Sequence, residues 1–263
     1  MKFEKDVAEL GKIEVKFSSS KKVLLQKEKR EQIFVPISNT LENIKLTNIR
    51  SFQTPTGTSK DTFITGIDMF YDGKIVLADE SKCRLAITNQ EGELIKTVQL
   101  GERCYDVAVI DKDTVATTLF LKRKVVIIDV NSAKVQRNLP TKDYCHGIIS
   151  TGEQLVVSLY NKTIQLFDLS GNALSTSSTA ADSGHCSVLN DKLYYTTYKS
   201  GVVYSTTLDG EVRWKFDCQK SDYPTGITND TSGNIFVACR DSNQLTVVGQ
   251  DGEKSRVLLT EEE

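Results

Sequence analysis

Cysteine and histidine side chains, which could bind a metal ion or act as nucleophile and base, recur at similar intervals along this chain. Aligned on the sequence repeat described next, they fall into two neighbouring positions, one holding Cys104, Cys145 and His185 and the other holding Tyr105, His146 and Cys186. Thiolates and imidazoles suit a soft metal such as zinc, and a cysteine paired with a histidine can serve in nucleophilic catalysis. Either chemistry requires the repeat to bring these groups together.

The repeat is a short motif that occurs five times. Its copies begin at Ile64-Thr65-Gly66-Ile67, Cys104-Tyr105-Asp106-Val107, Cys145-His146-Gly147-Ile148, His185-Cys186-Ser187-Val188 and Pro224-Thr225-Gly226-Ile227. The third positions are residues 66, 106, 147, 187 and 226, so successive copies are 39 to 41 residues apart. Each copy is followed by a turn, an apolar run, a polar loop and a second apolar run.

Short β-branched and aromatic runs bounded by Gly, Asn and Asp predict strands, and four strands per repeat of this length are typical of a β-propeller blade. Helical repeats would need a period of 3.6 residues, which no segment after Phe52 shows. We therefore predict an all-β fold, a β-propeller of four-stranded blades whose function lies in its loops.

The number of repeats predicts an incomplete ring of the six-bladed type. Ile44–Phe52 is expected to form a strand before the first full repeat, where a propeller places the outermost strand of its closing blade. Only Arg256–Leu259, the last strand of the fifth unit, and an acidic tail follow. A ring closed by five blades is the alternative. We favour the incomplete ring, whose open blade edges would be prone to association.

Residues 1–40 differ from the rest of the chain. Asp6–Gly11 is expected to be the last turn of a helix stopped by glycine, and Ile13–Phe17 alternates like a short strand. Stretches such as Lys27–Glu31 are typical of a solvated linker.

In a propeller, the cysteine and histidine positions lie near the mouth of the central channel. A structural metal site needs about four ligands at bonding distance, and columns on separate blades need not converge, so we expect no metal and no cofactor. Cys145 and His146 would point opposite ways on a strand, and we assign no catalytic residue. A lactonase-like hydrolase with a central cation is a distant alternative, because these positions offer only one acid, Asp106.

Composition is that of an ordinary globular protein. The 263 residues are 39% hydrophobic, and 33 Lys and Arg against 35 Asp and Glu give a net charge of −2, so no global field favours nucleic acid or anionic membrane. Neither a membrane span nor a secretory signal is expected, and we place the chain in the cytoplasm. The six cysteines show no C-x-x-C spacing and are expected to be free thiols.

The chain resembles the C-terminal NHL-like propeller of invertebrate tripartite-motif (TRIM) proteins. The segments that carry the resemblance are Leu10–Val15, Gln32–Pro36, Asn43–Leu46, Ile64–Ile67 and Asp72–Asp79. It implies two regions: residues 1–40 as a linker or coiled-coil end with short strands, and 41–263 as the propeller.

Members of this family carry a RING finger, B-box zinc fingers and a coiled coil before the propeller. They act as ubiquitin ligases whose propeller selects protein or RNA partners. None of the zinc ligands of those modules is present in the given sequence, so the resemblance implies that this chain supplies recognition and no catalysis. Self-association through blade edges, or through a coiled coil in a longer product, is a further expectation.

One loop face is the predicted partner-binding surface. Its outer loops combine basic and aromatic residues: Arg84, Phe120, Lys122, Arg123, Lys124, Tyr160, Lys162, Tyr198, Lys199 and Arg240. Cations that hold phosphates and rings that stack on bases suit single-stranded RNA, but the same rim suits an acidic peptide, or merely keeps the surface soluble. We expect a protein partner first and RNA second, because acids on the inner loops of the same face weaken its positive field.

Overall fold

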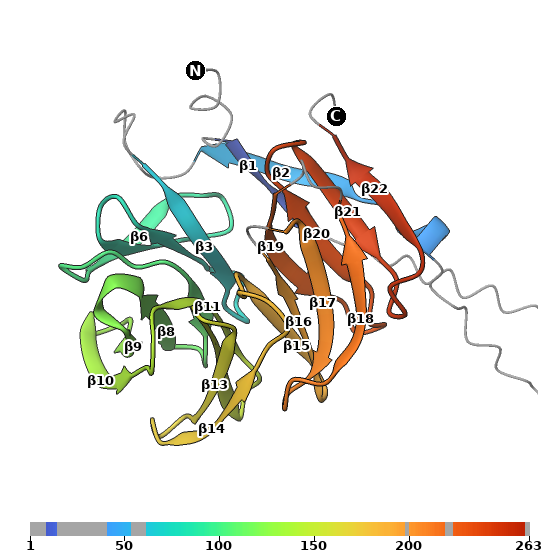
Figure 1. The fold of residues 1–263 in the computed structure, drawn as a ribbon. Coiled ribbons are helices and arrows are strands. Elements are labelled where there is room, and N and C mark those ends of the chain that lie inside the picture. The colour runs from blue at the N-terminus through green and yellow to red at the C-terminus, as the bar shows by residue number, and fades with distance from the viewer. Residues whose placement is uncertain (1–8, 15–40, 54–61, 198–199, 219–222, 261–263) are drawn as a thin grey trace, which may run out of the picture.

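The computed structural model describes residues 9–14, 41–53, 62–197, 200–218 and 223–260. Apart from two short 3-10 turns, its regular structure is entirely β, and five four-stranded antiparallel sheets are arranged as the blades of a propeller (Figure 1). This confirms the predicted all-β class and the five repeats. No helix among the described residues has the length and hydropathy needed to cross a bilayer.

Each blade is formed by four consecutive strands. Blade 1 contains β3 (Ile64–Met69), β4 (Ile75–Asp79), β5 (Arg84–Thr88) and β6 (Leu94–Gln99). Blade 2 contains β7 (Val107–Val109), β8 (Thr114–Leu119), β9 (Lys124–Asp129) and β10 (Lys134–Pro140). Blade 3 contains β11 (Cys145–Ser150), β12 (Gln154–Leu159), β13 (Thr163–Asp168) and β14 (Ala173–Ser178). Blade 4 contains β15 (Cys186–Leu189), β16 (Lys192–Thr196), β17 (Val202–Thr207) and β18 (Val212–Asp217). Blade 5 contains β19 (Pro224–Asn229), β20 (Ile235–Cys239), β21 (Gln244–Val248) and β22 (Ser255–Leu259).

The middle strands of each blade form the core. All five residues of β4 are buried, and so are most residues of β8, β12 and β16. The sheets of blades 2, 3 and 4 have a neighbouring blade on both faces, and β4 of blade 1 is covered by blade 2 and by Phe52. Strands buried on both faces have continuous apolar runs rather than alternating ones. The fourth strands face outward, as the largely exposed β14 shows.

A two-stranded sheet precedes blade 1. In it, β1 (Glu9–Glu14) pairs antiparallel with β2 (Thr47–Gln53), and a 3-10 turn, η2 (Leu41–Asn43), comes before β2. The predicted strand before the first repeat is therefore confirmed, although it begins at Thr47. The predicted helical turn is wrong for Glu9–Gly11, which belong to β1, because strand pairing with β2 overrides the local helix signal; residues 6–8 lie outside the described part.

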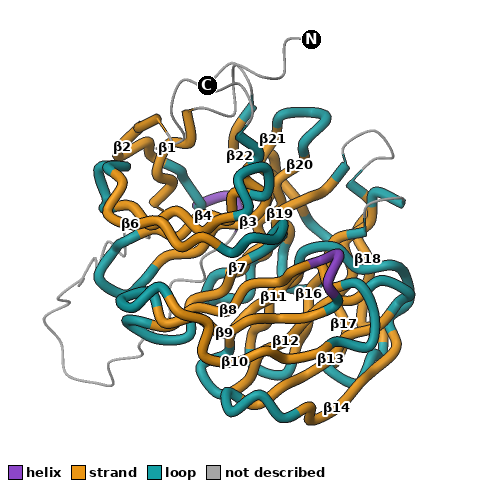
Figure 2. Tube along the Cα trace, turned by 90° about the vertical axis from the view of Figure 1, so that its left-hand side faces the viewer, coloured by secondary structure: helices purple, strands orange, loops and turns teal. Residues whose placement is uncertain are grey.

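The segment around β2 packs on both the last and the first blade. Ile44 is buried with Phe236 and Val247 of blade 5, whereas Phe52 packs against Leu77 and Ala86 of blade 1. In both views β1 and β2 accordingly lie between these two blades (Figures 1 and 2). We call residues 41–53 the strap.

Polar contacts join successive blades near their first strands. The hydroxyl of Thr118 donates to the carbonyl of His146 at 2.7 Å, Ser158 donates to the carbonyl of Gly184, and Thr196 donates to the carbonyl of Thr225 at 2.9 Å. These hydroxyl residues occupy the same position in blades 2, 3 and 4. Blades 1 and 5 have Ala78 and Ala238 there.

The first strands of neighbouring blades also approach so closely that some positions have no space for a side chain. A Cβ at Gly147 would lie 2.7 Å from the carbonyl oxygen of Gly184 and 2.7 Å from the Cα of His185. Among the described residues, a Cβ at the equivalent Gly226 of blade 5 would meet nothing closer than the Cβ of Ala238 at 3.8 Å.

We predict opposite outcomes for alanine at these two glycines. Gly147→Ala should lower the free energy of unfolding by at least about 2 kcal/mol, because backbone atoms of blade 4 cannot give way easily. Gly226→Ala should be neutral or slightly stabilising, since alanine costs less backbone entropy in a strand. Urea unfolding of both variants measures this difference, and equal losses would contradict the close approach at Gly147.

Candidate functional site

The backbone pairing corrects the predicted alignment of the fourth repeat by one residue. In their hairpins, Val107 pairs with Thr117, Ile148 with Val157, and Cys186 with Tyr195. Cys186 is therefore equivalent to Val107 and Ile148, and His185 is equivalent to Asp106 and Gly147. The predicted column of Cys104, Cys145 and His185 is wrong, because Ser183 is the blade 4 residue that aligns with the two cysteines.

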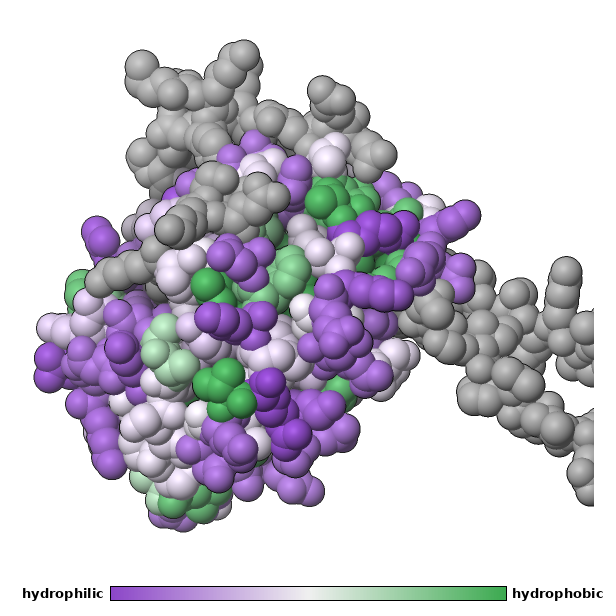
Figure 3. All heavy atoms as spheres, turned by 45° about the vertical axis from the view of Figure 1, so that its right-hand side comes forward, coloured by the Kyte–Doolittle hydropathy of each residue, from purple (hydrophilic) through white to green (hydrophobic). Residues whose placement is uncertain are grey.

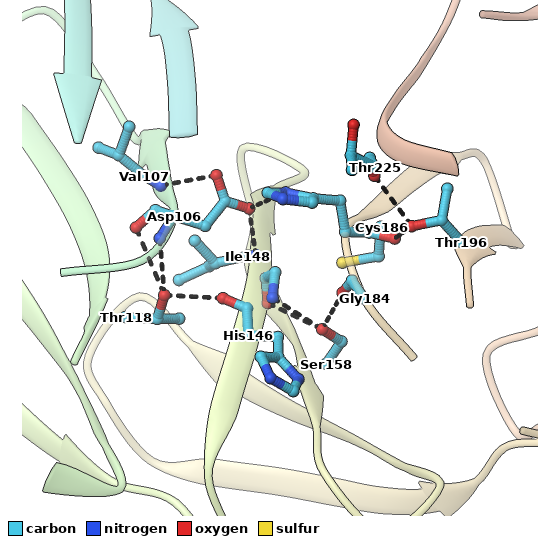
Figure 4. Close-up of polar contacts among 12 residues, drawn as sticks. Asp106, Val107, Thr118, His146, Ile148, Ser158, Gly184, Cys186, Thr196 and Thr225 are labelled. Atoms are coloured by element: carbon cyan, nitrogen blue, oxygen red, sulfur yellow. Dashed lines mark hydrogen bonds and ion pairs between the residues drawn. The ribbon is translucent and has the colours of Figure 1, made fainter. Parts of the chain in front are cut away.

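Asp106 is the centre of a buried polar network near the propeller axis (Figure 4). Its Oδ1 accepts the N–H of Val107 at 2.9 Å, and its Oδ2 accepts the N–H of Ile148 in blade 3, also at 2.9 Å. The Oδ2 atom also lies 3.3 Å from Nδ1 of His185 in blade 4. One carboxylate therefore contacts three successive blades.

Glycine at neighbouring positions makes this reach possible. Asp106 accepts a hydrogen bond from Ile148, the residue after Gly147 in blade 3, and its Oδ1 lies 2.5 Å from where a Cβ of Gly66 would be. Glycine therefore alternates with a larger residue at this repeat position, which leaves room for the Asp106 carboxylate and the His185 imidazole to meet. In blades 1 to 5 the position holds Gly66, Asp106, Gly147, His185 and Gly226.

Six aromatic rings from blades 2, 3 and 4 form a continuous cluster beside this network. The members of this ring cluster are Tyr105, Phe120, Tyr144, His146, Tyr160 and His185. Phe120 lies between His146 and Tyr144, with ring centroids 4.8 and 5.1 Å apart, and Tyr105 stacks on His185 at 5.5 Å. The cluster unites predicted loop aromatics with predicted channel-mouth residues. Tyr144 was missed, although its place just before Cys145 in the repeat could have indicated it.

A one-turn 3-10 helix, η3 (Phe120–Lys122), holds the exposed edge of this cluster. Arg123 ends it in the left-handed region with φ 49°, and its guanidinium lies 4.3 Å from the centre of the Tyr144 ring. Leu121, the middle residue of η3, is 59% exposed. The turn therefore presents an aliphatic side chain and a cation beside partly buried rings.

Neighbouring polar groups partner the three consecutive basic residues at the end of this turn and the start of β9. Lys122 forms an ion pair with Glu102 at 2.8 Å, and Arg123 lies 4.0 Å from Asp143. Lys124 donates to the amide oxygen of Asn138 at 2.9 Å. The rim is therefore mixed in charge, as the acids of the inner loops led us to expect.

Two of the other predicted rim residues, Arg84 and Arg240, have their partners outside the cluster. Arg84 is largely buried in an ion pair with Asp79 at 2.9 Å, so it is not the surface cation that we predicted. Arg240 lies over the ring of Tyr223 and binds Asp241 in blade 5. Lys162 is exposed, while Tyr198 and Lys199 lie outside the described residues.

The thiols lie in the packing between blades. Cys104 and Cys145 are buried, and their Sγ atoms donate to the carbonyls of Arg84 and Lys124 in the preceding blades at 3.3 and 3.4 Å. Burial raises the pKa of Cys104 to about 12 and that of Cys145 to about 11, so both remain protonated at neutral pH. Cys186 is buried with Val156 and its pKa is also raised by burial.

All six cysteines are free thiols. Among the described residues, no three His, Cys, Asp or Glu side chains come together as metal ligands would.

Comparison with known proteins shows the fold alone. No family model and no curated protein matches the chain. Among solved structures, virginiamycin B lyase from Staphylococcus aureus is 14% identical with a TM-score of 0.62, covering 76% of this chain and 71% of the lyase. A nidogen–laminin complex structure is 12% identical with a TM-score of 0.70, covering 84% and 89%. Glutaminyl cyclase from Myxococcus xanthus is 14% identical with a TM-score of 0.56, covering 76% and 93%.

These structures support a β-propeller. They include two enzymes and a protein complex, so the shared architecture does not select one function.

His146 gives the ring cluster a predicted pH dependence. Burial, aided by the nearby His185, lowers the pKa of His146 to about 4 from an ordinary 6.5. The unfolded chain therefore binds a proton that the folded chain excludes, and stability should fall as the pH drops from 6.5 toward 4. This contribution is at most about 3 kcal/mol.

The His146→Phe variant, which keeps a ring but cannot be protonated, tests this assignment. Urea unfolding at pH 7 and pH 4.5 should show a smaller loss of stability for the variant than for the parent chain. Equal losses would show that His146 is not held neutral by the fold.

Proposed function

We propose that this propeller is a non-catalytic recognition module that binds a protein partner at the ring cluster and the adjoining residues Leu121 and Arg123. The observation that carries the proposal is six aromatic rings gathered beside an exposed leucine and a stacked arginine. Aromatic side chains and arginine are enriched among the residues that dominate protein binding energies.

The proposed site is small, with Leu121 as the exposed aliphatic side chain beside the rings. The face of the molecule drawn in Figure 3 is polar over most of its area, with apolar residues in small separate patches. A partner that places a few side chains against the rings and pairs with the mixed charges around them fits such a site.

Protein is favoured over RNA because acids already neutralise the basic turn. Glu102 pairs with Lys122, and Asp143 lies near Arg123, so phosphates approaching these cations would also meet carboxylates. RNA remains the second candidate, since rings beside an arginine are also a base-stacking arrangement.

We also propose that the ring is an incomplete six-bladed one of the NHL-like TRIM class. The two-stranded β1–β2 sheet between blades 5 and 1 supports a partial sixth unit, and the repeat motifs support the class. In a longer ligase of that class, this chain would select substrates in the cytoplasm, and a RING finger would supply the ubiquitin transfer.

Site-specific photo-crosslinking tests the protein-binding proposal. A benzophenone amino acid replaces Leu121 in one variant. In a matched control it replaces Lys112, whose side chain is 86% exposed in the β7–β8 turn at the opposite ends of the strands. We expect discrete protein adducts from position 121 in cell extract, weakened by Arg123→Glu, and none of the same mass from position 112. Identical adducts at both positions, or none at 121, would contradict the proposal.

Fluorescence anisotropy with single-stranded RNA separates the second candidate. If protein is the partner, RNA should bind weakly, and the triple variant Lys122→Glu, Arg123→Glu and Lys124→Glu should differ little from the parent chain at either of two salt concentrations. Tight, salt-sensitive RNA binding that the triple variant abolishes would replace protein with RNA as the ligand.

A further inference from the structure

The inner part of blade 1 exposes apolar side chains on the face that has no complete blade before it. Ile67 is 57% exposed and Met69 is 52% exposed, and both lie on the first strand of the blade. The residues equivalent to Ile67 in blades 2 and 3, Val107 and Ile148, are each only 3% exposed. This repeat position is covered in blades 2 and 3, whereas in blade 1 no described residue covers it.

Blade 5 likewise exposes, on its opposite face, a repeat position that is buried in other blades. Ala238 is exposed, whereas Thr118, Ser158 and Thr196 at the same repeat position are buried. A Cβ at Gly226 would touch no described residue of another blade within 4 Å, whereas a Cβ at Gly147 would meet the backbone of blade 4. We call the region between Ile67 and Met69 on one side and Gly226 and Ala238 on the other the closing joint.

No hydrogen bond among the described residues joins β3 to β19 across the closing joint. The strap fills only its outer part, through Ile44 against blade 5 and Phe52 against blade 1.

The β1–β2 sheet at the closing joint has fewer described strands than the other blades. Every complete blade has four strands, but the sheet at the closing joint has two, with β2 paired to β1 and the other edge of β1 unpaired among the described strands. An unpaired strand edge is a template for strand addition. Two further antiparallel strands on that edge would extend the sheet toward the axis and give it the four strands of the other blades.

We propose that the closing joint binds a β-hairpin supplied by a partner polypeptide, which adds to the free edge of β1 and completes a sixth blade. This site is separate from the ring cluster and does not depend on the function proposed for it.

The intact joints specify the chemistry of this hairpin. At the joint between blades 1 and 2, Val107 belongs to one buried cluster with alternate residues of two adjacent strands, Val76 and Ala78 of β4 and Leu85 and Ile87 of β5. A hairpin covering Ile67 should therefore carry medium-sized apolar residues at alternate positions on one face. Its other face meets the small residues of blade 5, Gly226 and Ala238, where bulkier side chains have room.

The first hairpin of blade 1, β3–β4, is a ready probe, because it contains the two innermost strands that the sheet at the closing joint lacks among the described residues. A fluorescein-labelled peptide with the sequence of residues 64–79 is titrated into the purified chain and followed by anisotropy. We expect saturable binding, absent for a scrambled peptide. Amides of Glu9–Glu14 should gain protection from hydrogen exchange on binding, because β1 acquires a second hydrogen-bonded neighbour.

Two matched variants locate the binding. Ile67→Asp places a charge in the joint and should weaken binding at least about tenfold, while Ile95→Asp on the outer strand β6, where Ile95 is 53% exposed, should not change it. Both positions are exposed, so both variants should fold. Arg123→Glu should also leave hairpin binding unchanged, which separates this proposal from that for the ring cluster.

Any of three results would overturn the proposal: the hairpin peptide shows no saturable binding, it binds Ile67→Asp as tightly as the parent chain, or the β1 amides gain no protection from hydrogen exchange. Light scattering measures the molecular mass of the purified chain and so tests a further alternative. A mass of twice 29.3 kDa that Ile67→Asp reduces to that of one chain would show that a second copy occupies the joint instead.

Discussion

The close approach of first strands near the propeller axis is the constraint on which the rest of this structure depends. At each joint between complete blades, a side chain crosses to the next blade's backbone or side chain: Asp68 accepts from the N–H of Val109, and hydroxyl groups of blades 2, 3 and 4 reach the carbonyls of blades 3, 4 and 5. Glycine is required where backbones nearly touch. A crossing hydroxyl or a glycine is needed only where a neighbouring blade is present. The residue type at such a repeat position therefore indicates whether the joint is complete.

The same constraint explains the position of the ring cluster. Gly147 lets the backbone of blade 4 approach blade 3 closely, and His185 of blade 4 lies 3.3 Å from the Asp106 carboxylate, while Tyr105 stacks on its imidazole. The rings are thus anchored to the buried network at the axis, while η3 carries their outer edge to the surface. We expect a ring cluster that packs on a buried polar network to be more rigid than a loop of the same composition. Such rigidity reduces the conformational entropy lost when a partner binds.

Much of the fold could be predicted from the sequence, and the exceptions have physical causes. The five repeats were predictable because buried strands require apolar runs and tight turns require glycine or asparagine. The one-residue shift in blade 4 was not, since His185-Cys186-Ser187 fits the motif in either frame and only strand pairing distinguishes them. The burial of Arg84 was also hidden, because its partner Asp79 lies across a turn within the same blade. The ring cluster was predicted in part, but its continuity depends on side-chain directions that repeat spacing does not give.

The strap has a mechanical consequence. Within the described part of the chain, blades 1 to 5 are linked in series by four polar joints, whereas blades 5 and 1 are connected through the apolar contacts of Ile44 and Phe52 and the bond from Arg256 to the carbonyl of Ile44. Among the described contacts, blades 2, 3 and 4 are held by polar joints on both sides, whereas blades 1 and 5 are each held by one. Under strain we expect the strap contacts to separate before these joints, and the ring cluster lies on the three blades that the joints hold together.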